Sequence, residues 1–128
     1  MKKYIMAIDQ GTTSTRAIVF DKMQNCVATA QREVKNYFPE PGYVNMDANE
    51  IWLSVLSCIA DIFRSSSIKP QEIEAIGISN QRETTIIWDR HTGIPIDYAI
   101  VWQSRETSDI IEEYKAMGVE AMIKEKTG

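Results

Sequence analysis

Apolar runs and polar segments alternate along the first part of the chain. The apolar runs occupy residues 4–8, 17–20 and 26–30, and polar residues separate each run from the next. Short connections make neighbouring strands antiparallel. The pattern therefore predicts a three-stranded antiparallel meander over about the first 35 residues. The sequence PEPG at residues 39–42 breaks any regular element.

A helical pattern begins behind Asp47, which is a good N-cap residue, and Glu50 occupies the capping-box position. The helix is predicted to end near residues 65–70, where a run of serines and a proline interrupt it. We expect its apolar stripe to face the core, with Trp52 as an anchor. The stripe consists of Ile51, Trp52, Val55, Leu56, Ile59, Ala60 and Phe63.

Residues 73–79 form the next predicted strand. A strand, a long helix and a strand favour a right-handed crossover, which places this strand parallel to the first one. The carboxyl ends of the two strands would then lie side by side, where open α/β sheets bind ligands. Residues 9–11 and 80–83 leave those ends, so we expect these two polar turns to line one cleft.

The last third of the chain predicts a hairpin and two helices. Residues 84–88 and 94–102 read as hairpin strands, although Pro95 limits pairing at the start of the second. Apolar spacing over residues 110–117 predicts a helix closed by Gly118, and a short amphipathic helix follows. The only histidine, His91, lies beside a turn glycine and is expected at the surface.

Composition narrows the class of protein. The 128 residues suffice for about one small domain, and 44% hydrophobic and 25% charged residues are ordinary for a globular protein. A net charge of −4 without a basic cluster argues against nucleic acid or an anionic membrane as partner. No apolar run approaches the roughly 20 residues of a membrane span. Cys26 and Cys58 lack metal-ligand spacing; as the only two cysteines they could pair, but we expect free thiols in a reducing cytosol, and a cytoplasmic protein.

The segment between the first two apolar runs, DQGTTSTR at residues 9–16, concentrates groups that bind phosphate. Gly11 can adopt backbone angles closed to other residues, so a turn there can direct several N–H groups into one concavity. Hydroxyl groups and a guanidinium follow and would add donors for phosphate oxygens. These donors belong to Thr12, Thr13, Ser14 and Arg16.

Asp9 would repel a phosphate directly, but Mg²⁺ resolves the conflict because it binds one or two carboxylates together with phosphates. The alternative is a polar hairpin turn with a solvated aspartate, since such turns are common. Neither a G-x-x-x-x-G-K-[ST] loop nor a G-x-G-x-x-G loop is present, and no helix pattern begins after Gly11. A phosphate would therefore lie in a hairpin bend rather than at a helix N-terminus.

Four segments together resemble the glycerol kinases of the FGGY carbohydrate kinase family. They are DQGTTS at residues 9–14, PGYV at 41–44, NQRETT at 80–85 and AIVWQSR at 99–105. The resemblance implies an α/β, ribonuclease-H-like fold of the actin and hexokinase superfamily. Its mixed sheet has three antiparallel strands first, then a helix and a parallel strand. Residues 1–128 would be an incomplete N-terminal domain, without the second domain.

The resemblance also implies roles for individual residues. Asp9 would hold Mg²⁺, and the four donor residues of the turn would contact the phosphates of ATP. Arg82 and Glu83 would hydrogen-bond the hydroxyls of glycerol, and Trp102 would pack on its carbon backbone. The alternative for Arg82 and Glu83 is an ordinary ion pair at the end of a strand.

The implied reaction is the ATP-dependent phosphorylation of glycerol to sn-glycerol 3-phosphate. The catalytic base of the family lies downstream, so no catalytic residue is expected in this chain, and the chain alone would be inactive. The parent enzyme is expected to be a homo-oligomer, and the isolated fragment is expected to self-associate. Two other hypotheses remain at this stage: another FGGY sugar kinase such as a pentulose kinase, or a non-catalytic nucleotide-binding module.

Overall fold

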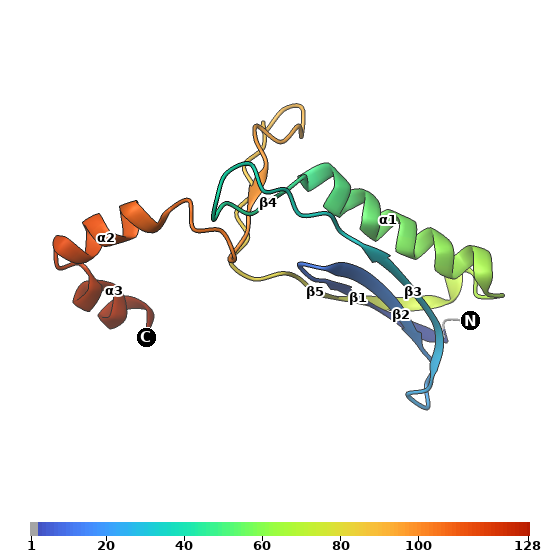
Figure 1. Ribbon diagram of the computed structural model, residues 1–128. Coiled ribbons are helices and arrows are strands. Elements are labelled where there is room, and N and C mark those ends of the chain that lie inside the picture. Colours follow the sequence, from blue (N-terminus) through green and yellow to red (C-terminus); the bar gives the residue numbers. More distant parts are fainter. Residues whose placement is uncertain (1–2) are drawn as a thin grey trace.

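A computed structural model describes residues 3–128, and it arranges a four-stranded sheet, one long helix and a smaller C-terminal part (Figure 1). The strands are β1 (Tyr4–Gln10), β2 (Ser14–Phe20), β3 (Cys26–Glu33), β4 (Asn45–Met46), β5 (Ile73–Ser79) and β6 (Ala99–Ile100). The helices are α1 (Ala48–Ser65), the 3₁₀ turn η1 (Pro70–Glu72), α2 (Ser108–Ala116) and α3 (Glu120–Thr127).

The main sheet has the strand order β3-β2-β1-β5. β1 and β2 are antiparallel, as are β2 and β3, whereas β5 runs parallel to β1. The predicted meander and the parallel fourth strand are therefore confirmed. The pairing places Asp9 of β1 opposite Arg16 on one side and opposite Ser79 of β5 on the other.

Helix α1 covers one face of this sheet (Figure 1). Alternate residues of β1 and β2 point toward the helix, as expected for strands with one buried face. The core between the two layers contains Met6, Ile8, Ala17, Val19, Cys58, Ile62 and Ile68.

The face of α1 that packs on the sheet agrees with the prediction only in part. Four residues of the predicted stripe are buried or pack against a core cluster: Ile51, Val55, Ile59 and Phe63. Trp52 was expected as a core anchor, but its side chain is 60% exposed, and Leu56 is exposed as well. The helix instead buries Ser54 and Cys58 together with Ile51 and Ile62. Ser54 is tolerated there because its hydroxyl is hydrogen-bonded, which removes most of the cost of burying a polar group.

The N-terminus of α1 is capped as predicted, but without the capping box. The carboxylate of Asp47 accepts a hydrogen bond from the N–H of Asn49 at 2.7 Å. The carboxylate of Glu50 accepts one from the hydroxyl of Tyr37 at 2.8 Å instead. Tyr37 precedes β4, so this bond connects the loop before the helix to its first turn.

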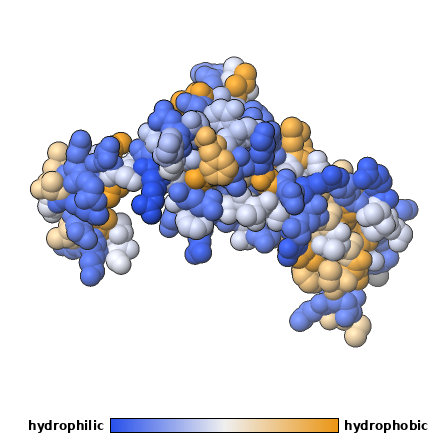
Figure 2. Space-filling model, viewed as in Figure 1, coloured by the Kyte–Doolittle hydropathy of each residue, from blue (hydrophilic) through white to orange (hydrophobic). Residues whose placement is uncertain are grey.

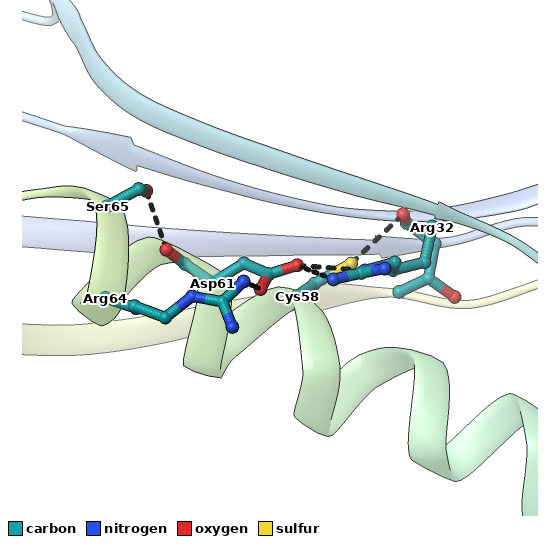
Figure 3. Close-up of polar contacts among 6 residues, drawn as sticks. Arg32, Cys58, Asp61, Arg64 and Ser65 are labelled. Atoms are coloured by element: carbon teal, nitrogen blue, oxygen red, sulfur yellow. Dashed lines mark hydrogen bonds and ion pairs between the residues drawn. The ribbon is translucent and has the colours of Figure 1, made fainter.

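Ionic contacts tie the C-terminal half of α1 to the outer strand β3 (Figure 3). Asp61 on the helix accepts hydrogen bonds from Arg32 on β3 and from Arg64 one turn further along the helix. The carboxylate is only 19% exposed, whereas both guanidinium groups are more open to solvent. Nearby, the thiol of the buried Cys58 donates to the carbonyl of Thr15 at 3.3 Å. Both cysteines are free thiols, as predicted.

A second hydrophobic cluster lies at the other end of α1. It contains Val34, Met46, Ile51, Ala99 and Val101. The short strands β4 and β6 pair antiparallel beside it. The hairpin predicted over residues 84–102 is only partly formed, because single bridges join Thr85 to Ile100 and Trp88 to Pro95.

The two C-terminal helices form as predicted, with Gly118 between them in the left-handed backbone region at φ +72°. They project away from the main sheet and α1 (Figure 1). Figure 2 shows hydrophobic residues among charged ones on the surface of this projecting part. Within residues 3–128, no helix has the length and apolar character needed to cross a membrane.

Candidate active site

The carboxyl ends of β1 and β5 meet at one edge of the sheet, and a cavity of about 460 Å³ opens there. The turn after β1 contributes Gly11 and Thr12, and the turn after β5 contributes residues 80–83. Trp102, which follows β6, completes the lining. The predicted convergence of the two polar turns on one cleft is therefore present, with Trp102 added from a third segment. Four of the predicted site residues lie outside the lining of this cavity: Asp9, Thr13, Ser14 and Arg16.

The turn after β1 is tight because of a close backbone approach at Gly11. Its N–H donates to the carbonyl of Ser14 at 3.0 Å, and a Cβ at Gly11 would lie 3.3 Å from the same oxygen. The φ angle of Gly11 is not in the left-handed region, so the expected reason for glycine was wrong. Space, rather than backbone angle, favours glycine here, because a Cβ would crowd the carbonyl oxygen of Ser14.

Two hydrogen bonds from the segment after β3 fix the turn that follows β1. The N–H of Val34 donates to the carbonyl of Thr13 at 3.0 Å, and the amide of Asn36 donates to the carbonyl of Thr12 at 3.4 Å. Within residues 3–128, the N–H groups and hydroxyls of Thr12 and Thr13 meet no acceptor. The turn is thus fixed through its carbonyl groups, and its donors are left for a ligand.

Ser14 and Arg16 alternate along β2 with Thr15, which points toward α1. They therefore lie on the sheet face opposite the helix, together with Asp9 of the neighbouring strand. Asp9 and Arg16 are direct cross-strand partners, yet no ion pair joins them in the described part of the chain. Both side chains are exposed. Gln31 of β3, which the sequence did not single out, hydrogen-bonds both Arg16 and Ser14.

On the opposite side of the cavity, the side chains of Arg82 and Glu83 are exposed. Neither forms an ion pair with any of the described residues. The ion pair considered as an alternative for these two residues is therefore not formed. Glu83 has φ 60°, which is uncommon for a residue with a side chain. Such strained positions gather at functional sites, where the surrounding structure holds them in place.

The indole of Trp102 is 59% exposed and forms an apolar wall of the cavity. Its backbone is held by the preceding residue, Val101, which is buried in the second cluster. On the other side, the hydroxyl of Ser104 accepts from the N–H of Val44 at 3.1 Å and donates to the carboxylate of Glu106 at 2.9 Å. Trp102 therefore projects from a segment that is fixed at both ends.

Gln81 is a lining residue that the sequence did not single out by itself. Its side chain is only 8% exposed, and its amide N–H donates to the sulfur of Met46 at 3.5 Å. The amide oxygen has no hydrogen-bond partner in residues 3–128. No signal in a single sequence distinguishes this glutamine from a solvated one, because the contact with Met46 exists only in the folded chain.

Asp9, the candidate metal ligand, is not part of a cluster of metal-binding side chains. Among the described residues, no group of three or more histidine, cysteine, aspartate or glutamate side chains could hold a metal ion. Asp9 lies on the sheet face beside the turn after β1, and Glu33 of β3 is the cross-strand partner of Ser14 on the same face. That donor set suits Mg²⁺, which binds through one or two carboxylates and takes its other ligands from phosphates and water.

The N-terminal domain of the FGGY family of carbohydrate kinases matches residues 4–128. The chain belongs to this family. Its fold is accordingly that of the actin and hexokinase superfamily, as predicted, with three antiparallel strands followed by a helix and a parallel strand.

Relatives with high identity carry the name glycerol kinase. The protein of Ligilactobacillus salivarius is 64% identical over 126 residues, which cover 98% of this chain and 25% of that protein. The protein of a Geobacillus species is 55% identical over the whole chain and 26% of its own length. This chain thus spans about a quarter of the curated relatives that it matches.

Solved structures of the family have the same fold. A glycerol kinase of Plasmodium falciparum with ADP superposes with a TM-score of 0.82 at 32% identity, over 88% of this chain and 23% of that one. A ligand-bound xylulose kinase of Lactobacillus acidophilus superposes with a TM-score of 0.88 at 26% identity, over 98% of this chain and 25% of that one.

Proposed function

We propose that this chain is the N-terminal part of a cytoplasmic glycerol kinase, which transfers the γ-phosphoryl group of ATP to glycerol and forms sn-glycerol 3-phosphate. The observation that carries the proposal is the shared cavity. A turn with free N–H and hydroxyl donors and a turn with an unpaired arginine and glutamate line the same 460 Å³ space. The identity of 55–64% to proteins named glycerol kinase favours glycerol as the acceptor.

The donors at the first turn suit the phosphates of ATP. Thr12, Thr13 and Ser14 would offer hydroxyl groups, and Arg16 a guanidinium that binds phosphate oxygens through paired N–H groups. Phosphoryl transfer depends mainly on positioning and on electrostatic stabilisation of the phosphoryl oxygens. Asp9 would hold Mg²⁺ beside the turn, and the ion would neutralise phosphate charge when bound.

The opposite side of the cavity suits a small polyol. Arg82 would donate to hydroxyl oxygens and Glu83 would accept from hydroxyl protons, so the pair fixes the orientation of the triol. Trp102 would cover the C–H groups. A few placed polar groups beside an apolar wall are the usual composition of a small-molecule site. The base that accepts the proton of the attacking hydroxyl would come from a part of the enzyme outside this chain.

A pentulose kinase is the second candidate, because the xylulose kinase superposes with the higher TM-score of the two solved structures described above. The sequence identity of this chain to that enzyme is 26%, well below its identity to the bacterial glycerol kinases. Backbone similarity is shared across the family, whereas the residues at the acceptor site decide the substrate. The comparison therefore favours glycerol.

The test is a coupled assay of ADP production by the full-length protein that contains this chain, with glycerol and with xylulose as acceptors. We expect turnover with glycerol and little with xylulose. The isolated 128-residue chain is expected to give no glycerol-dependent ADP. Turnover with xylulose alone would contradict the proposed substrate, and turnover by the isolated chain would contradict the need for a base supplied from elsewhere.

Variants of the full-length protein separate the proposed glycerol site from the proposed phosphate site. Arg82→Ala is expected to raise the KM for glycerol at least about tenfold, because it removes a charged hydrogen-bond donor, and to leave the KM for ATP nearly unchanged. Arg16→Ala is expected to raise the KM for ATP and to leave the KM for glycerol nearly unchanged. Arg90→Ala, in the exposed turn near His91, is the matched control and should change neither constant.

A further inference from the structure

Gln31 joins two of the residues that we assign to ATP phosphates. It lies on β3 directly opposite Arg16 of β2. Its amide oxygen accepts from Nε of Arg16 at 3.3 Å and from a terminal guanidinium nitrogen at 3.1 Å. Its amide nitrogen donates to the hydroxyl oxygen of Ser14 at 3.0 Å. One side chain thus contacts both phosphate-facing residues of the strand.

The orientation of this amide follows from the chemistry of its partners. A guanidinium only donates hydrogen bonds, so the Gln31 atom that faces Arg16 has to be the oxygen. The amide nitrogen then faces Ser14. Because the nitrogen occupies the acceptor side of the Ser14 hydroxyl, the hydroxyl proton remains available, and it meets no acceptor in residues 3–128. Gln31 thereby orients Ser14 as a donor.

The neutrality of Gln31 matters as much as its hydrogen bonds. Residue 32, the next one along β3, is an arginine that points to the other face of the sheet, where Asp61 compensates its charge (Figure 3). Arg16 forms no such ion pair in the described part of the chain, since its partner is an uncharged amide. The guanidinium is therefore held in place without an ion pair, although Asp9 is its cross-strand neighbour on the same face.

We propose that Gln31 is a positioning residue of the phosphate site: it holds Arg16 and Ser14 as oriented donors without adding a negative charge beside Arg16. This inference rests on the proposed function, because it takes the ligand of Arg16 and Ser14 to be the phosphates of ATP. Such donors, fixed before the ligand arrives, need no reorganisation when it binds.

Two variants of the full-length protein test the proposal by opposite means. Gln31→Glu keeps the shape and the contact with Arg16, which becomes an ion pair, but it reverses the hydrogen bond to Ser14, because a carboxylate accepts the hydroxyl proton instead of donating to the oxygen. Gln31→Met keeps the length and removes the hydrogen bonds without adding charge. We expect the KM for ATP to rise at least about tenfold in Gln31→Glu and about threefold in Gln31→Met. The KM for glycerol should change less than about twofold in both.

Denaturant unfolding of the same variants separates this role from a structural one. A structural role predicts that Gln31→Met, which loses the contacts, is impaired the most in both stability and ATP binding. We expect the reverse order for ATP, with Gln31→Glu at least as stable as the parent protein and yet the poorest binder. Thr29→Val, on the same strand and the same face, is the control and should leave the KM for ATP unchanged.

Each outcome bears on a definite claim. If both variants are active and their KM for ATP is unaltered, the role of Gln31 is overturned. The same holds if the rise in the KM for ATP is largest in the least stable variant. Either result leaves the proposed function intact. Turnover with xylulose instead of glycerol would overturn the substrate, while the KM for ATP would still test Gln31. A parent protein that binds no ATP would overturn both.

Discussion

At the scale of single residues, only a few charged side chains of the described chain form ion pairs, among them Lys3 with Glu72 at 2.9 Å and Arg32 with Asp61. The candidate site residues are not among them. Asp9, Arg16, Arg82 and Glu83 have no ionic partner in the part of the chain that the structure describes. Exposed ion pairs contribute little to stability, so leaving these charges free costs the fold little.

The phenol of Tyr37 gives a prediction about pH. Its hydrogen bond to the carboxylate of Glu50, together with partial burial, raises the pKa of Tyr37 to about 12. Because this value lies above the unfolded value of about 10, the bond stabilises the fold fully below about pH 10. The stabilisation is lost as the pH rises through about 12. Glu50→Gln should lower the pKa of the phenol toward its ordinary value.

The measurement is an ultraviolet titration of phenolate absorbance, with Tyr37→Phe subtracted to isolate this tyrosine from the four others. Glu125→Gln in the remote helix α3 removes the same charge and should leave the titration unchanged. A phenol of Tyr37 that titrates near 10 in the parent protein would show that the bond to Glu50 does not persist in solution.

At the scale of elements, a buried chain of hydrogen bonds joins helix α1 to the start of β2. The hydroxyl of Thr15, which is 0% exposed, lies 2.6 Å from that of Ser54, and Ser54 donates to the carbonyl of Ile51 at 2.7 Å. Since Ser54 has one proton and gives it to Ile51, Thr15 has to donate to Ser54. The helix therefore holds the strand beside the phosphate turn through a directed contact.

We expect Ser54→Ala to destabilise the protein by about 1–3 kcal/mol, because it leaves the Thr15 hydroxyl buried without an acceptor. Thr15→Val should cost about 1 kcal/mol, since it removes the donor and keeps the shape. The double variant should cost less than the sum of the two. Urea unfolding measures all three, and additive effects would contradict the directed contact.

The same contact explains where the sequence failed for α1. Its position and cap were predictable from spacing and from Asp47. The buried face was predictable only in part, because hydropathy counts Trp52 as a core residue and Ser54 as a surface residue. The hydrogen bonds that satisfy Ser54 come from the fold and are invisible in the pattern of the helix alone. The hairpin predicted over residues 84–102 was also only partly correct, since isolated bridges replace a continuous ladder there.

At the scale of the whole molecule, topology made the candidate site predictable. The crossover rule alone was enough to bring residues 9–11 and 80–83 to one edge of the sheet. What the rule could not supply was the contact between neighbouring strands that orients Arg16, or the left-handed backbone of Glu83. Both depend on register and turn geometry, which a single sequence does not determine.

The exposed edge strand β5 leads to a prediction about self-association of the isolated chain. β5 is an outermost strand, and every residue after Ile73 in it is exposed, including Ile76 and Ile78, the latter by 74%. These two isoleucines are paired with β1 residues that face α1, so they lie on the helix side of the sheet but are not covered. An open strand edge beside apolar side chains promotes association.

We therefore expect the 128-residue chain to self-associate in sedimentation velocity, with an average mass that rises with concentration. Ile78→Lys should shift it toward the monomer, because the charge opposes pairing at that edge. Thr29→Lys places the same charge on β3, the opposite edge of the sheet, and should have a smaller effect if association runs through β5. Equal effects of the two variants would point to net charge rather than to the β5 edge, and a parent chain that stays monomeric and melts cooperatively would contradict the prediction outright.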